Sequence, residues 1–153
     1  MSSLVSVNPT EGQIVTNSAF WPDIDTTDMR GSVRLDGQVT EERLLNETRE
    51  AMARVNRELR DWQFIQQAAG YTALSEIPAE VIDGQSVLVM RYCRAVYCTA
   101  KALLLEGYRD IDTTRDGEKH AEALSTQIES AWRDSQWALR DIMGLSRALA
   151  EIV

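Results

Sequence analysis

The dominant hydrophobic pattern lies in the middle of the chain, in the run from Ser86 to Gly107, most of which is apolar or aromatic. Its apolar positions fall on every side of a helical wheel, and a helix of that kind has to be buried. Arg91, Arg94 and Lys101 interrupt the run, so no uncharged stretch approaches the ~20 residues that a membrane span requires. The pattern predicts the central helix of a soluble core, starting after Asp83-Gly84 and ending where the run stops.

A second helix is predicted for residues 41–69, where apolar residues recur in steps of three and four and so share one face. Thr40 is placed to cap it, and the acidic residues that open it suit the positive end of the helix dipole. Ala69-Gly70 ends it. The other faces carry Glu–Arg pairs at i,i+4. The predicted core stripe is Leu45, Thr48, Met52, Val55, Leu59 and Trp62.

A third long helix is predicted after Gly117, with Gly144 as the residue that stops it. Beyond Gly144 the apolar period changes from that of a helix to an alternation typical of a strand. Residues 145–153 are therefore expected to form an extended tail that can act as a strand. The predicted core stripe of the helix is Leu124, Ile128, Ala131, Ser135, Ala138 and Ile142.

The remaining segments are short. Residues 1–19 are polar without a period and are expected to form a flexible arm. Phe20 and Trp21 are expected to pack on the bundle, and Asp25 to cap a short helix over residues 26–35, followed by a turn at Asp36-Gly37. Residues 71–84 are expected to make a packed connection anchored by Leu74, Ile77 and Ile82, and residues 108–117 a loop.

These elements together predict an all-α fold, a small helical bundle around a buried central helix. The bundle is expected to span residues 20–144, between the arm and the tail. The chain has 153 residues, which suits one domain with its own core.

The net charge is −8 at pH 7, and only two of the 16 basic residues are lysines. This excess of acidic residues argues against a surface that binds nucleic acid by neutralising its phosphates. The first residues carry neither a basic region nor an apolar run, so no export signal is expected and the protein is expected to stay in the cytoplasm.

The chain carries little catalytic chemistry. Cys93 and Cys98 lie five residues apart on one helix, which separates their Cα atoms by about 8 Å. A disulfide needs less than about 7 Å, so two reduced thiols are expected. His120 is the single histidine, and no zinc spacing, Glu-x-x-His pair, nucleophile elbow or P-loop is present. We therefore expect no enzyme, with no catalytic, cofactor or metal residues.

One polar surface has two interpretations. Glu118, Glu122, Ser125 and Glu129 lie about 130° around the last helix from its apolar face. Such a stripe is either a solubilising face or a surface that must not bind DNA.

Six segments follow one another at characteristic spacing after residue 19. They are Phe20-Trp21-Pro22-Asp23-Ile24-Asp25, Arg34-Leu35-Asp36-Gly37-Gln38-Val39-Thr40, Ile77-Pro78-Ala79-Glu80-Val81-Ile82-Asp83-Gly84, Tyr92-Cys93-Arg94-Ala95-Val96-Tyr97 with Ala100-Lys101, Tyr108-Arg109-Asp110-Ile111-Asp112-Thr113-Thr114, and Trp137-Ala138-Leu139-Arg140-Asp141-Ile142-Met143-Gly144. The set resembles the head completion protein (GPL) family of tailed bacteriophages with contractile tails. The resemblance runs from about residue 20 to the C-terminus.

The resemblance implies a virion structural protein of the head-tail neck, made in the host cytoplasm. Such an adaptor docks on the portal vertex after DNA packaging, stabilises the filled head and provides the platform for tail attachment. The implied partners are the portal protein, a tail-side neck or tail-completion protein, and neighbouring copies in a ring, commonly of twelve, through which DNA passes without specific binding. No membrane and no cofactor is implied.

Two site hypotheses follow from the residues and the resemblance together. Residues expected to bind the portal are Arg147, Leu149, Glu151, Ile152 and Val153. Residues expected to face the DNA channel are Glu118, Glu122 and Glu129. The competing interpretation is a cytoplasmic helical protein–protein interaction module that acts as a monomeric or dimeric regulator.

Overall fold

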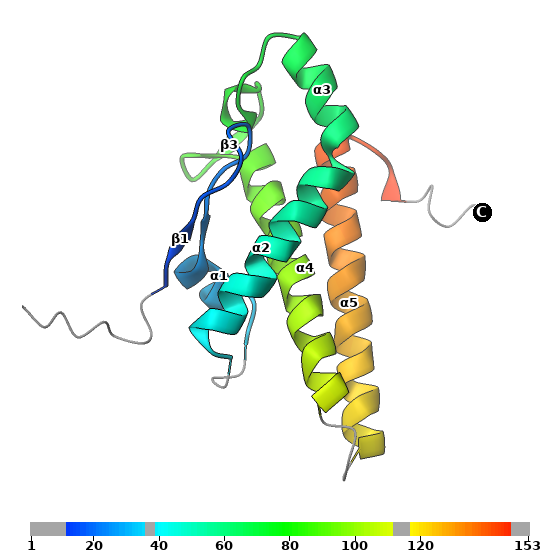
Figure 1. Ribbon diagram of the computed structural model, residues 1–153. Coiled ribbons are helices and arrows are strands. Elements are labelled where there is room, and N and C mark those ends of the chain that lie inside the picture. Colours follow the sequence, from blue (N-terminus) through cyan, green and yellow to red (C-terminus); the bar gives the residue numbers. More distant parts are fainter. Residues whose placement is uncertain (1–11, 36–38, 112–116, 148–153) are drawn as a thin grey trace, which may run out of the picture.

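The computed structural model describes residues 12–35, 39–111 and 117–147, and these residues are mostly helical (Figure 1). They contain five α-helices, one short 3₁₀-helix and two small antiparallel sheets of two strands each. One hydrophobic cluster links the described segments from Phe20 to Ile142. The predicted arm up to residue 11 and the turn at Asp36-Gly37 lie outside the described residues.

The N-terminal segment has regular structure that the sequence analysis does not predict. Strand β1 (Ile14–Val15) pairs antiparallel with β2 (Ile24–Asp25). Helix α1 (Thr26–Ser32) follows, and the predicted Asp25 cap is confirmed, since its carboxylate accepts from the Thr27 N–H at 2.8 Å. The helix ends at Ser32 rather than at residue 35, because the chain becomes extended at Val33 and buries that side chain.

The second predicted helix is two helices, α2 (Glu41–Glu58) and α3 (Arg60–Ala68). Its cap is as expected, with the Thr40 hydroxyl accepting from the Arg43 N–H at 3.3 Å. The prediction of one continuous helix is wrong at Leu59, where the backbone leaves helical geometry. Within the predicted stripe Leu45 and Trp62 are only half-buried, whereas the residues between them are buried, and the stripe omits the fully buried Leu44.

The connection to the central helix contains the 3₁₀-helix η1 (Leu74–Glu76) and a hairpin of β3 (Val81–Ile82) and β4 (Gln85–Ser86). Positive φ values of 52° at Asp83 and 75° at Gly84 match a type I′ turn, the usual two-residue hairpin connection. Leu74 is buried, as predicted. The prediction that Ile82 anchors the connection is wrong, because this side chain is 48% exposed on the hairpin.

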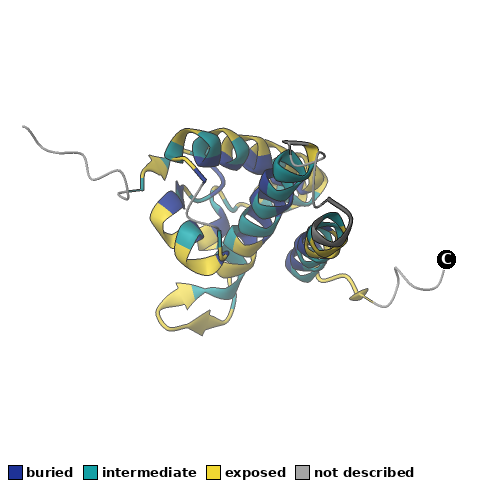
Figure 2. Ribbon diagram, turned by 90° about the horizontal axis from the view of Figure 1, so that it is seen from below, coloured by how far each residue is buried: buried dark blue, intermediate teal, exposed yellow. Residues whose placement is uncertain are grey.

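The predicted central helix is α4 (Val87–Ile111), and it packs against both α2 and α5 (Gly117–Met143) (Figures 1 and 2). It is not buried on every face, since Arg91 and Arg94 are exposed. The expected stop at Gly107 is also wrong. A Cβ there would lie 2.8 Å from the Arg43 guanidinium, which also lies 5.4 Å over the Tyr108 ring. The absence of a side chain at Gly107 therefore lets Arg43 of α2 lie close against α4.

Residues 108–111, expected in a loop, belong to α4, and residues 112–116 are not described. In α5 the predicted stripe is confirmed from Ile128 to Ile142, while Leu124 is half-buried. Thr99 and Ser135 share a buried hydrogen bond of 2.7 Å between α4 and α5. Trp132 adds a second cross-link, from its Nε1 to Glu106 Oε1 at 2.7 Å.

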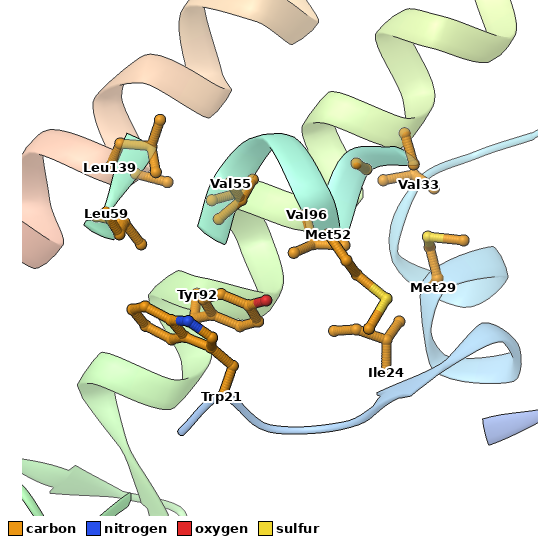
Figure 3. Close-up of a cluster of buried hydrophobic side chains, with 14 of the residues drawn as sticks. Trp21, Ile24, Met29, Val33, Met52, Val55, Leu59, Tyr92, Val96 and Leu139 are labelled. Carbon is orange, nitrogen blue, oxygen red and sulfur yellow. The ribbon is translucent and has the colours of Figure 1, made fainter. Parts of the chain in front are cut away.

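The N-terminal segment is held on the bundle by Trp21, whose ring stacks on Tyr92 of α4 with centroids 4.8 Å apart (Figure 3). Trp62 stacks on the same indole at 6.3 Å. The Tyr92 hydroxyl donates to Asn56 Oδ1 at 2.6 Å and accepts from Asn17 Nδ2 at 2.7 Å. Three segments that are distant in sequence therefore meet at one buried phenol.

Replacing Tyr92 by Phe tests this junction. The substitution leaves the amide groups of Asn17 and Asn56 without that partner, so the free energy of unfolding should fall by about 1–3 kcal/mol. Urea denaturation followed by circular dichroism measures it. Tyr97→Phe on the same helix is the matched control and should cost less, because its half-buried hydroxyl interacts with the Cys93 thiol instead. An equal loss in both variants would argue against the junction.

Candidate interaction surfaces

Among the described residues, no group of three or more His, Cys, Asp or Glu side chains is placed to hold a metal ion. No described helix is long and apolar enough to cross a membrane. Cys93 and Cys98 are free and half-buried on α4, and burial raises the pKa of both thiols, which favours their neutral, less nucleophilic form. The candidate functional sites in the described part of the chain are therefore surfaces.

The acidic stripe lies along the first half of α5. Glu122 and Glu129 are exposed, and the buried stripe of the same helix packs on α4. Glu118 belongs to α5 as well, although its side chain is outside the described part of the chain. The structure thus places all three glutamates on one helix.

Helix α5 ends where the sequence predicts. Gly144 has φ of 71°, the left-handed conformation that glycine adopts readily. The Leu145 N–H then donates to the Arg140 carbonyl oxygen at 2.9 Å, a bond that closes a Schellman-type C-cap. The chain leaves α5 in a direction that this backbone turn defines.

The residues after the cap are held against α5 by a group of side chains that we call the Arg147 clamp, made of Arg147, Asp141, Trp137 and Arg133. Arg147 donates twice to the Asp141 carboxylate, from Nη2 at 2.6 Å and from Nε at 3.3 Å. Its guanidinium lies 4.7 Å from the Trp137 ring centroid, and that of Arg133 lies 4.8 Å from the same centroid. The Asp141 carboxylate raises the pKa of Arg147 through these hydrogen bonds.

The clamp ties the first residues of the predicted tail to α5. Residues 145–147 pair with no strand in the described chain, and Arg147, one of the expected portal-binding residues, is engaged within its own chain. The other four, Leu149, Glu151, Ile152 and Val153, lie outside the described residues. Sequence reasoning missed the clamp because Asp141 and Arg147 are six apart across a turn, beyond the i,i+4 spacing considered on helices.

Two further surfaces have no counterpart in the sequence analysis. The first is the β3–β4 hairpin, which projects from the bundle with Val81 and Ile82 exposed (Figure 2). The second is a cleft of about 370 Å³ between α2 and α5, which we call the α2–α5 cleft. Its lining includes Glu50, Arg54, Val55, Arg57, Glu58, Thr99, Trp132, Ser135, Gln136 and Leu139.

The comparisons with known proteins agree with each other. A family model described as phage head completion protein (GPL) matches residues 15–153. A curated relative, the head completion/stabilization protein of Escherichia phage P2, is 38% identical over 136 residues, which cover 89% of this chain and 80% of the relative. No solved structure matches the chain.

The Arg147 clamp can be tested with Arg147→Lys, which keeps the charge but loses the planar fork that pairs with a carboxylate and stacks on a ring. The melting temperature should stay nearly unchanged, because exposed ion pairs contribute little to stability. The amides of residues 145–147 should exchange faster with solvent, and the Trp137 indole resonance should shift.

Arg133→Lys is the matched control for the clamp. It should shift the Trp137 resonance while leaving amide hydrogen exchange at residues 145–147 unchanged, because Arg133 pairs with Asp134 rather than with any of those residues. Unchanged exchange in Arg147→Lys would show that the backbone cap alone orders this segment.

Proposed function

The chain belongs to the phage head completion protein (GPL) family, and on that premise we propose that it is a head-to-tail adaptor. In this proposal it docks on the portal vertex after DNA packaging, stabilises the filled head and forms the platform to which the tail attaches. The family is a structural one rather than an enzyme family.

The observation that carries the proposal is the extent of the family match. It runs from β1 through α5 and over the segment beyond Arg147, so it covers the whole described fold from residue 15 onward. The phage P2 relative, whose name includes both head completion and stabilization, is similar over most of both chains. Nothing in the described residues specifically favours the alternative of a regulatory interaction module.

The proposal places about twelve copies in a ring at the head-tail neck. Their partners are the portal protein on the head side, a neck or tail-completion protein on the tail side, and neighbouring copies. The protein is made in the host cytoplasm and joins the filled head there.

The tail is proposed to be the portal-binding segment. An extended segment can complete its backbone hydrogen bonds on an edge strand of another chain, while alternate side chains fill pockets. Because Arg147 is engaged with Asp141 and Trp137, we assign the contact itself to Leu149, Glu151, Ile152 and Val153. Arg147 then fixes the point from which they leave.

The acidic stripe is proposed to face the DNA channel of the ring. Packaged DNA has to pass without sticking, and carboxylates repel its phosphates. The exposure of Glu122 and Glu129 on the side of α5 away from its buried stripe supports this orientation.

Deleting residues 148–153 tests the tail. Helical circular dichroism and melting should be nearly unchanged, because every described helix and the Arg147 clamp remain. Portal binding and completion of filled heads should fall sharply. A longer deletion, from Arg147 to Val153, should lower portal binding and head completion at least as much, because it also removes the clamp. A truncated protein that completes heads at the normal level would contradict the tail's role.

Charge reversal tests the stripe. Changing Glu118, Glu122 and Glu129 to Lys should leave folding intact but create DNA binding that weakens as salt rises, and slow DNA ejection. The matched control reverses Glu42, Glu47 and Asp61, the same number of acids on α2 and α3. If ejection and DNA retention are normal in particles that carry the α5 variant, the stripe is only a solvated face.

A further inference from the structure

One side of α4 has the residue spacing of a helix that packs along a second helix. Counted from Val87, the members of this row follow in steps of four, three, four, three and four residues. Alternating steps of three and four keep side chains in one row and form the seam of paired helices. We call the row the α4 heptad face, and it consists of Val87, Arg91, Arg94, Cys98, Lys101 and Leu105.

The α4 heptad face is not covered by its own chain. Arg91 and Arg94 are exposed and the other four side chains are half-buried, whereas the side of α4 that holds Thr99 against α5 is buried. From Val87 to Leu105 the row extends about 27 Å, at 1.5 Å per residue. Helix α4 therefore keeps a long surface for helix packing that no described element occupies.

The charge of the α4 heptad face is entirely positive. Its charged members are Arg91, Arg94 and Lys101, and the first acidic residue of α4 comes only at Glu106. None of the three cations forms an ion pair or a side-chain hydrogen bond with a described residue. Arg91 and Arg94 lie one turn apart, where like charges repel each other. Within a chain of net charge −8, such a face is complementary to an acidic partner.

The groups beside the face indicate a protein partner rather than a nucleic acid. Asp134 of α5 lies near the middle of the face and pairs with Arg133 at 3.5 Å, so that side is neutral. On the other side Asp25 and Asp28 share a pocket with Met90 of α4. A nucleic acid would bring a continuous row of phosphates against these two carboxylates. A protein helix can instead place its acidic residues opposite the three cations alone.

The described part of this chain offers no helix with the required pattern, so the partner is a different protein. Outside α4, the exposed large apolar residues on helices are Phe64 and Ile65 of α3. The charges of α3, at Arg60 and Asp61, balance each other. The acidic stripe of α5 has Ser125 rather than a large apolar residue in its row of glutamates.

We propose that the α4 heptad face binds an acidic amphipathic helix of another protein in the filled head. The apolar residues of that helix pack against Val87, Cys98 and Leu105, and its carboxylates lie opposite the three cations. Burial of the apolar positions holds the two helices together, while the charges fix their register. The proposal rests on the proposed function, which places the chain in the filled head.

The test places a photo-crosslinking leucine analogue at Leu105 in the full chain and irradiates filled heads completed with that protein. Mass spectrometry should find an adduct with a different protein, in a peptide whose acidic residues recur every three or four positions among apolar ones. An adduct with a second copy, with DNA or with a peptide that lacks acidic residues would overturn the proposal. Heads that contain the chain but yield no adduct would overturn it as well.

The double variant Arg91→Glu and Arg94→Glu should lower the adduct yield per chain in the heads by about tenfold or more, because acids then face the acidic helix. Melting should stay nearly unchanged, since both side chains are exposed. The matched control, Arg57→Glu and Arg60→Glu, reverses an exposed pair of the same spacing elsewhere and should keep the yield. Equal yields from the two double variants would also overturn the proposal. Absence of the unmutated chain from filled heads would instead contradict the proposed function.

Discussion

The stack of Trp21 on Tyr92 is the contact on which the arrangement of this fold depends. It is the place where the N-terminal segment, α2 and α4 meet, and the Tyr92 hydroxyl is satisfied there by Asn17 and Asn56. Burial raises the pKa of this phenol, so it stays protonated and able to donate. The short N-terminal strands could not form a stable sheet alone and depend on this attachment.

Helix α4 packs against two helices, α2 and α5, that hardly touch each other. Helix α2 covers one side and α5 another, and each buries its apolar stripe on α4 rather than on its neighbour. The surface features described above follow from this plan. A cleft opens between α2 and α5, the hairpin extends from the first turn of α4, and α5 keeps an acidic face toward solvent.

Features set by local chemistry could be predicted from the sequence. The caps at Asp25 and Thr40, the stop at Gly144 and the stripe of α5 each depend on residues within a turn or two. The failures depend on distant contacts. Leu59 interrupts a helical pattern because the chain turns to keep it buried, and Gly107 stays in a helix because Arg43 lies against it. The acidic stripe was visible in the sequence, whereas the α2–α5 cleft, which needs three helices in space, was not.

The Arg147 clamp fixes the origin of the segment that follows it. With Arg147 held on Asp141, that segment starts from one point on α5 rather than from a mobile helix end. A tether with a fixed origin samples a smaller volume than one whose origin moves, and this raises its effective concentration at a nearby site.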